Sequence, residues 1–458
     1  MLKYSYFIPI LTLTACSILA PDRQDPKVSL PDTWSEQGEL AESNLPYIAW
    51  WYKFNDPNLN KLIESGLHNS NSIAQAQANI EQAQGQLSAV ELSWIPSITA
   101  LAGVINFQPF LPQAQTMYGG YAGYSSLNIF SMVAQQKSAK LNIQAKEKAF
   151  EGAKLDLTAQ IAISYYTLIA QKEELKLYQQ YIADLEEQQI LQKHKTKGGL
   201  STTADDLNVN KTILNAKLQQ KNIENNIAKS QNSLNYLLNQ NPGIIYSTSD
   251  FASVNTIYGN IVSLPTTVIG NRPDVAMAAL QYKYAAQNVT ANYMQLLPSF
   301  MLGYGPAVVS SGGIPGMPDS TTSTFQQNFI TWSMNPAIFG QAGSLKGSEK
   351  YYYANYIDTV RKALMDISND LTTNRITNER YQLTIEEMKI SQIKYAMNYT
   401  LYRRGLRAYS DNLEDKISID ETKISVNQMK LSQMQAIIAL YKDLGGGYKY
   451  NESQPITQ

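Results

Sequence analysis

Two very long stretches without proline constrain this chain more than any other feature of its sequence. They run from Ser131 to about Thr196 and from Gln341 to Arg403. At the usual rise per residue, each stretch would form a helix of roughly 95–100 Å. A helix of that length cannot be buried in a globular core, so it must be supercoiled or bundled with neighbouring helices.

The first of these stretches carries two apolar patterns. One follows the 3-4-3 spacing of a coiled-coil seam: Leu175, Tyr178, Ile182 and Leu185. The other drifts around the helix: Ile161, Ile163, Tyr166, Leu168 and Ile169. A helix that has neighbours on two sides, as in a cylinder wall, needs such a widened stripe.

The chain reads as two halves with the same plan, about 200 residues apart. Three signals recur in the same order: Pro96-Ser97 and Pro298-Ser299, Asn128 with Phe130 and Asn335 with Phe339, Gly199-Leu200 and Gly405-Leu406. Each half predicts a helix, two strands, a long helix and a return helix. We expect one repeat over 70–260 and the other over 261–447. An N-terminal segment over 16–69 precedes them, and a tail over 448–458 follows.

The expected elements follow from periodicity and from breaker residues. The first half predicts helices over Ile73–Trp94, Ser131–Thr196 and Thr202–Asn239, with strands over Ile98–Asn106 and Tyr121–Phe130. The second half predicts helices over Val275–Leu297, Gln341–Arg403 and Ala408–Leu444, with two strands around Ser310–Ser323.

The strands of the second half alternate in side-chain size. Phe300, Leu302 and Tyr304 alternate with Met301, Gly303 and Gly305, and Ile330, Trp332 and Met334 alternate with Thr331 and Ser333. Membrane-spanning strands alternate in this way between lipid-facing and lumen-facing positions. The alternative is a pair of soluble hairpins packed on the helices, and Ile98–Asn106 alternates poorly.

Counting the strands favours a shared assembly. Four strands cannot close a barrel in a membrane, where about eight are the minimum and an open edge is not tolerated. Three chains would supply twelve strands and, from four long helical pieces each, a twelve-helix cylinder. The sequence therefore predicts a mixed α and β fold with a trimeric twelve-stranded transmembrane β-barrel.

The N-terminus predicts a lipid anchor. Met1–Ala15 has the basic residue and short apolar stretch of a signal peptide, and Leu13-Thr14-Ala15-Cys16 resembles a bacterial lipobox. In such signals cleavage leaves the cysteine as the new N-terminus, with lipid on its sulfur. Ser17, rather than Asp, follows Cys16, and by resemblance to such signals this favours sorting of the protein to the outer membrane. The alternative is an ordinary signal peptide with an incidental cysteine.

Composition argues against several classes of function. The formal net charge of −1 gives no basic surface for nucleic acid. One cysteine and two histidines, His68 and His194, argue against a His/Cys metal centre and histidine-based catalysis. P-loop, GxSxG and HExxH patterns do not occur. We therefore expect no enzyme, no metal and no cofactor apart from the lipid on Cys16.

Four further motifs carry a family resemblance. They are Trp50-Trp51 with Phe54-Asn55-Asp56-Pro57-Asn58-Leu59, Leu264-Pro265 with Asn271-Arg272-Pro273-Asp274, Leu297-Pro298-Ser299, and Leu440–Tyr448. In this order they resemble the TolC/OprM family of outer-membrane efflux proteins, in its lipoprotein, NodT-like branch. The resemblance implies a barrel continued by a long periplasmic α-helical barrel. It also implies a homotrimer that works with a periplasmic adaptor protein and an inner-membrane RND pump.

The resemblance also implies a gate at the periplasmic end. In OprM-like members an apolar residue and an aspartate four positions later form the constriction, and by distance from Gly405 these positions are Ser410 and Glu414. The other candidates for a charged aperture are Arg404, Tyr409, Asp411 and Asp415. An equally weighted alternative is that the acids are solvated charges early in a helix, where they suit the dipole.

The tips of the two helical hairpins are the candidate docking points for the adaptor. They contain Gly198, Gly199 and Leu200 in the first half, and Gly405 and Leu406 in the second. A plain glycine cap at a helix end is the alternative, and it explains the glycines but not the leucines beside them.

The function predicted from the sequence is a passive outer-membrane channel in a tripartite efflux system, conducting drugs or toxic compounds out of a Gram-negative cell. Three alternatives remain open: an exit duct of type I secretion for polypeptides, a periplasmic adaptor lipoprotein, and a structural lipoprotein of the cell surface. The paired strands and the duplicated hairpin speak against the adaptor.

Overall fold

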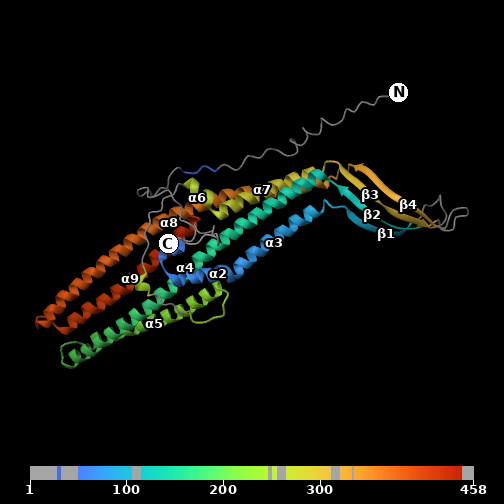
Figure 1. The fold of residues 1–458 in the computed structure, drawn as a ribbon. Coiled ribbons are helices and arrows are strands. Elements are labelled where there is room, and N and C mark those ends of the chain that lie inside the picture. Colours follow the sequence, from blue (N-terminus) through green and yellow to red (C-terminus); the bar gives the residue numbers. More distant parts are fainter. Residues whose placement is uncertain are drawn as a thin grey trace. The chain divides into compact units, whose positions relative to one another are not determined.

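The computed structural model describes residues 28–31, 50–105, 115–245, 250–254, 265–310, 320–332 and 335–445. The predicted signal peptide, Cys16 and the tail over 448–458 lie outside the described residues. Within them the element order is the same in both halves of the chain: a helix, two strands, a very long helix and a shorter return helix (Figure 1).

Corresponding elements have nearly equal lengths. The first half contains α3 (Asn71–Leu92), β1 (Ser97–Ile105), β2 (Gln115–Leu127), α4 (Ile129–Lys197) and α5 (Thr203–Leu237). The second contains α7 (Pro273–Met294), β3 (Ser299–Ser310), β4 (Ser320–Thr331), α8 (Ala337–Arg403) and α9 (Tyr409–Asp443). The long helices have 69 and 67 residues, and both return helices have 35. Short elements precede each half: η1 (Trp50–Phe54) and α2 (Pro57–Asn69), then η2 (Phe251–Ser253) and α6 (Pro265–Asn271).

The same local signals start and end these elements. β1 and β3 both begin at the serine that follows a proline. An asparagine then caps each long helix: the side chain of Asn128 accepts from the backbone N–H of Ser131, and that of Asn335 accepts from Ala337. The two halves differ at their return helices, because Thr202 and Asp205 form a capping box on α5 whereas Ala408 offers α9 no side-chain cap.

The described strands form one antiparallel sheet in the order β1-β2-β3-β4. Its central pair, β2 and β3, joins the two halves of the chain and places Gly123 opposite Gly303. Small residues are required there, because a Cβ at Gly123 would lie 2.1 Å from the backbone oxygen of Leu302, and one at Gly305 would lie 2.0 Å from that of Gly120.

Two strand boundaries differ from the sequence expectation. Phe130 belongs to α4 and not to a strand, since the Asn128 cap starts the helix before it. In the second half, the strands are longer than the expected Ser310–Ser323 region, which covers the end of β3, the connection and the start of β4. The predicted alternation is confirmed in β3, where Leu302 and Tyr304 are exposed and Gly303 and Gly305 are buried. None of the described helices contains a segment that is long and apolar enough to cross a membrane.

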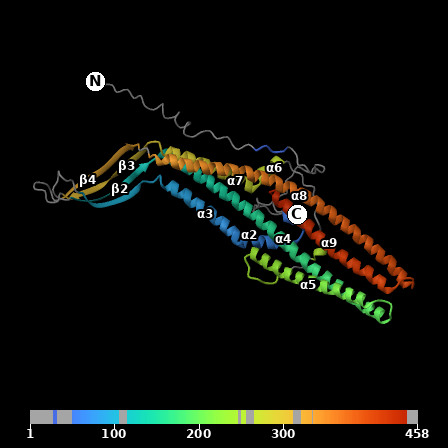
Figure 2. The ribbon, with the colours of Figure 1, turned by 180° about the vertical axis from the view of Figure 1, so that it is seen from behind.

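The chain forms two compact units, and each contains segments of both halves. One unit comprises residues 1–28, 78–148 and 276–359 and includes the sheet. The other comprises 29–77, 149–275 and 360–458. It contains the hairpin of α4 and α5 beyond residue 149 and the hairpin of α8 and α9 beyond residue 360, and in both views α9 runs beside α4 (Figure 2).

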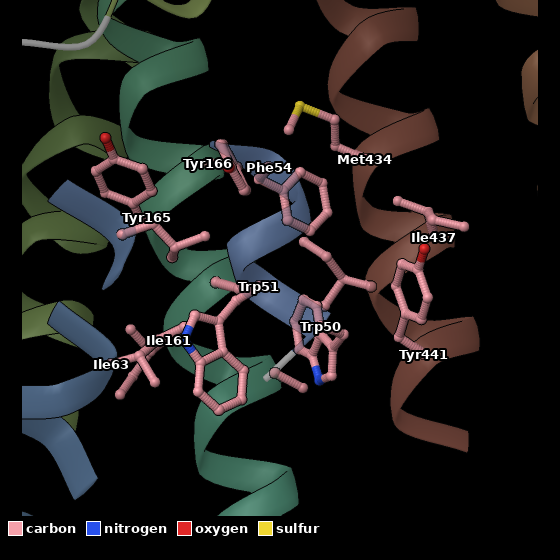
Figure 3. Packing of buried hydrophobic residues seen from close by; sticks show 14 of the residues in the cluster. Trp50, Trp51, Phe54, Ile63, Ile161, Tyr165, Tyr166, Met434, Ile437 and Tyr441 are labelled. Carbon is pink, nitrogen blue, oxygen red and sulfur yellow. The ribbon is translucent and has the colours of Figure 1, made fainter. Parts of the chain in front are cut away.

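The core of this second unit is built around η1. Trp50 and Trp51 are almost fully buried between α4 and α9, and the ring of Trp50 stacks on Tyr441 at 5.6 Å (Figure 3). The part of α4 that was predicted to have a widened stripe is buried on several sides, including Ile161, Tyr166 and Leu168. That prediction is confirmed.

A second apolar cluster lies farther along α4. Ile182 and Leu185 of the predicted seam pack with residues from both return helices, namely Ile213 and Ala216 of α5, and Leu413, Ile417 and Ile424 of α9. The seam prediction is therefore confirmed as well. These apolar contacts hold α4 against α9 up to the region where α9 begins.

Candidate functional site

The two hairpin tips have the same backbone form. Gly199 and Gly405 both have φ of +74°, a left-handed conformation that glycine adopts at low cost. The N–H of Leu200 donates to the carbonyl of Lys195, and the N–H of Leu406 donates to that of Leu401. Glycine capping therefore explains both turns.

The leucines at these tips contribute nothing to the caps through their side chains. Leu200 is 83% exposed and Leu406 is 73% exposed. Gly198 continues the last turn of α4, since its N–H donates to the carbonyl of His194. The tips thus present apolar side chains to their surroundings, which is what a docking surface requires and what a cap alone does not.

The candidate gate residues lie at the end of α8 and in the first turns of α9. Ser410 donates to Oδ1 of Asp411, and the guanidinium of Arg407 lies 3.8 Å from Oδ2 of the same carboxylate. Arg404 is exposed in the turn. Glu414 is exposed and forms no ion pair with any residue that the structure describes. The structure therefore joins Ser410 to Asp411 by a hydrogen bond, whereas the side chains of Arg404 and Glu414 are exposed.

Tyr409 is the gate candidate with the most specific contact. Its hydroxyl donates to Oε1 of Glu187 on α4 at 2.5 Å. This hydrogen bond, followed by burial and the charge of Glu187, raises the pKa of Tyr409 to about 12. The bond ties the first residue of α9 to the neighbouring hairpin.

A row of tyrosines supports Tyr409. Its ring lies 5.3 Å from that of Tyr402, which is followed along α8 by Tyr399 at 6.2 Å and then Tyr395 at 5.9 Å. This row was not predicted from the sequence. The spacing of four and three residues on a helix is the signal that could have identified it.

Asp415 has a different environment from the one expected at an aperture. It is buried, and it accepts from Asn398 at 2.6 Å and pairs with Lys394 at 2.8 Å and Arg407 at 3.2 Å. Burial opposes its ionisation, but Lys394, Asn398 and Arg407 outweigh burial and hold the pKa of Asp415 below its usual 3.8. Asp415 therefore joins α8 to α9 within one hairpin. The roles of Lys394, Asn398 and Arg407 were not predicted from the sequence.

Polar contacts between α4 and α9 complete the site. Besides the Tyr409–Glu187 bond, Tyr181 donates to Glu421 at 2.8 Å, and Lys416 pairs with Asp184 at 2.8 Å. Among the described side chains, no three His, Cys, Asp or Glu residues are arranged to hold a metal ion.

Comparison with known proteins extends over the whole chain. A family model described as outer membrane efflux protein matches residues 62–240 and 264–446. The chain is 23% identical to a probable efflux pump outer membrane protein, TtgC of Pseudomonas putida, covering 99% of this chain and 97% of that one. It is 22% identical to a probable outer membrane lipoprotein, SilC of Salmonella typhimurium, covering 98% and 99%.

A solved structure has the same fold. The outer-membrane channel OprN superposes with a TM-score of 0.79 at 18% identity, covering 94% of this chain and 99% of that one. The two matched segments of the family model together include all of α3, α4, α5, α7, α8 and α9, and the described strands. The chain therefore belongs to the outer membrane efflux protein family.

Proposed function

We propose that this chain is the outer-membrane channel component of a tripartite efflux system and conducts small molecules from the periplasm to the exterior. The observation that carries this proposal is the match to the efflux family over both repeats, which includes the sheet and both helical hairpins. Efflux relatives such as TtgC share this full length. The protein is located in the outer membrane.

We further propose that three copies form the channel. Leu383, Ile390 and Met397 of α8 recur every seven residues and are exposed, and so are Leu207 and Leu214 of α5. Heptad spacing is typical of a helix that packs against another helix. The two stripes lie on different helices, so the α8 stripe of one copy would pack against the α5 stripe of the next copy. Repeating this head-to-tail contact through three copies would close a ring.

The sheet supports the same assembly. β1 and β4 each pair on one side only within the described residues, so each copy offers two edges. Joining β4 of one copy to β1 of the next would give twelve strands in a closed transmembrane barrel, in which no edge faces lipid. A trimer thus covers the apolar stripes and the strand edges at once.

The transport energy would come from partners. We propose that the chain is not an enzyme and needs no cofactor, and that an inner-membrane RND pump drives export through a periplasmic adaptor. The exposed Leu200 and Leu406 at the hairpin tips would contact that adaptor. Cys16, by its lipobox, would carry the lipid anchor, and the relative SilC is described as a probable outer membrane lipoprotein.

The channel proposal is tested by reconstitution in planar bilayers. The purified protein should cross-link as a trimer and give discrete, cation-preferring currents. Ile390→Asp should abolish both, because it places a charge in the exposed stripe. Lys389→Asp, at the neighbouring exposed position, is the matched control and should change neither. A monomer without conductance would contradict the proposal.

The partners and the anchor are tested in cells. A Leu200→Asp, Leu406→Asp double variant should keep its conductance but lose the adaptor in pull-downs from cell envelopes. Ile190→Asp, at an exposed position of α4 away from the tip, is the control. Cys16→Ser should remove incorporation of labelled fatty acid. Export of a polypeptide in place of small compounds would favour the secretion duct.

A further inference from the structure

Two buried aspartates meet between α4 and α9. Asp184 is 3% exposed and Asp420 is 2% exposed, although both belong to helices with long solvent-facing surfaces. The Oδ1 atom of Asp184 accepts from Lys416 at 2.8 Å and from Gln180 at 3.0 Å. The Oδ1 atom of Asp420 accepts from Lys423 at 2.9 Å. One oxygen of each carboxyl is therefore well satisfied.

The second oxygen of each carboxyl lacks a hydrogen-bond donor. Oδ2 of Asp184 and Oδ2 of Asp420 are both buried, and neither has a donor among the residues that the structure describes. The two carboxyls are near enough for a hydrogen bond between them to affect the ionisation of both. A buried acceptor without a donor is costly, and two buried carboxylates in contact repel each other.

We infer that Asp184 and Asp420 share one proton, and that this proton fastens α9 to α4. Asp420 holds the proton and donates it to Oδ2 of the ionised Asp184. A single proton removes both costs, the unsatisfied buried oxygens and the charge repulsion, because it supplies the missing donor and cancels one of the two negative charges. It also makes the contact between two helices dependent on pH.

The ionisation of each partner is consistent with this assignment. Burial, and then the hydrogen bond with Asp184, raise the pKa of Asp420 against the opposing charge of Lys423. Burial opposes ionisation of Asp184 too, but hydrogen bonds from Asp420, Lys416 and Gln180 outweigh it and lower the pKa of Asp184. The proton therefore stays on Asp420.

The sign of the pH effect follows from the raised pKa of Asp420. A group whose pKa is higher in the contact than in solution stabilises the contact at low pH, and this contribution is lost as pH rises through the raised pKa. The lowered pKa of Asp184 keeps that residue ionised throughout this range. Rising pH thus removes the shared proton and leaves two buried anions side by side.

The surrounding charges offset only part of this repulsion. On α9, Lys416 and Lys423 are each 39% exposed, so water screens them, and both already bind the Oδ1 atoms. Of the other charged groups on the helices packed here, Glu187 of α4 acts on Lys416, and Glu421 accepts from Tyr181. Lys217 of α5 pairs with Glu186, and Lys394 of α8 pairs with Asp415.

The shared proton bears on the proposed channel, and this part of the inference rests on the proposed function. Along α9, Asp420 follows the gate candidates by a few turns, and its neighbour Glu421 makes another of the bonds to α4. Loss of the proton would weaken the hold of α4 on α9 behind the gate. Raising the pH should therefore favour the open state.

Infrared spectroscopy of the purified protein tests the proton directly and does not depend on conductance. The native protein should show a carbonyl band of a protonated carboxylic acid that disappears as pH rises. Asp420→Asn should lower the intensity of this band and leave the part due to Asp370, whose pKa is raised to about 7 by burial and by Asp443. Glu186→Gln, which removes an exposed carboxylate two residues from Asp184, should leave the intensity unchanged. An equal band intensity in Asp420→Asn and in the native protein at every pH would overturn the inference.

A second variant keeps the test valid if Asp420→Asn fails to fold. Lys423→Met removes the charge that favours ionised Asp420, so the band should persist to higher pH; an unchanged titration would overturn the inference. An absent band, together with a native structure that depends on sodium or potassium at fixed pH, would show that a cation occupies the place of the proton.

Conductance provides the functional arm. As pH rises through the raised pKa of Asp420, the open fraction of the native channel and of Glu186→Gln should rise about tenfold, a change typical of losing one charge-assisted hydrogen bond. In Asp420→Asn, whose amide can donate to Asp184 at any pH, it should stay constant. An equal rise in that variant would sink the inference. Absence of any current with the infrared band intact would instead count against the proposed channel function.

Discussion

The hydroxyl of Tyr409, the first residue of α9, donates to Glu187 of α4 over a separation of 222 positions in the chain. The bond holds the end of one hairpin against the other. Because the pKa of Tyr409 is raised to about 12, the phenol keeps its proton in neutral solution and the bond persists. Tyr409→Phe removes only the oxygen, so the open fraction of the channel should rise several-fold in single-channel recordings.

Tyr399→Phe is the matched control for that change. Tyr399 belongs to the same row of rings, but no hydrogen bond of its hydroxyl is among those that the described residues provide. Its loss should leave the open fraction unchanged. Equal currents in both variants and in the native protein would remove Tyr409 from the gate.

Glu414 is the exposed acid at the position where the family resemblance predicts a constriction. Glu414→Ala should raise the conductance or the open fraction and reduce the preference for cations, because a ring of three like charges is lost. The free energy of unfolding of this variant should differ from that of the native protein by no more than about 0.5 kcal/mol, as for most exposed positions. Unchanged currents would show that Glu414 is a solvated charge and nothing more.

Substitution of Asp415, the next residue in the sequence, should instead lower the stability of the protein. Asp415→Asn removes the charge that Lys394 and Arg407 bind, and the free energy of unfolding should fall by about 1–3 kcal/mol. The depressed pKa of Asp415 means that its contribution is present above about 3.8 and is lost as pH falls through the lower value in the folded protein. Denaturant melts of the variant should therefore lack this loss at acid pH, whereas Glu414→Gln should keep it.

Arg272 should matter for stability more than any exposed arginine. It is buried, and its guanidinium binds both carboxylate oxygens of Asp274 and the backbone carbonyl of Asp443 at the end of α9. Arg272→Ala leaves Asp274, whose side chain is 44% exposed, without its partner and should cost about 2–3 kcal/mol in unfolding experiments. Arg375→Ala, which breaks an exposed ion pair with Glu379, should cost about 0.5 kcal/mol or less. Similar losses in the two variants would contradict this account.

Much of this fold follows from signals that are local in the sequence. Proline-free stretches, the glycines at 199 and 405 and the asparagines at 128 and 335 fix helices and their ends within one or two turns, so all the long elements were expected correctly. β2 was misplaced because its Gly, Tyr and Ser residues do not alternate clearly, and its register depends on the distant partner β3.

The candidate site likewise contains residues that could be predicted from the sequence and residues that could not. The exposed tips were identified from the sequence, since a leucine beside a glycine cap is a local anomaly. The burial of Asp415 was not, because it depends on Lys394 and Asn398 from the preceding helix. The meeting of Asp184 with Asp420 depends on which face of α9 lies against α4, and neither helix reveals this alone.

The pairing of β2 with β3 has a consequence for synthesis. Met117 is opposite Val309, so the middle of the sheet cannot form until the second half of the chain has left the ribosome and reached the same compartment. Until then the first half carries a strand hairpin with an unoccupied edge, which could join foreign strands. A chain that ends after α5 is therefore expected to aggregate, and supplying the missing half in trans should rescue it.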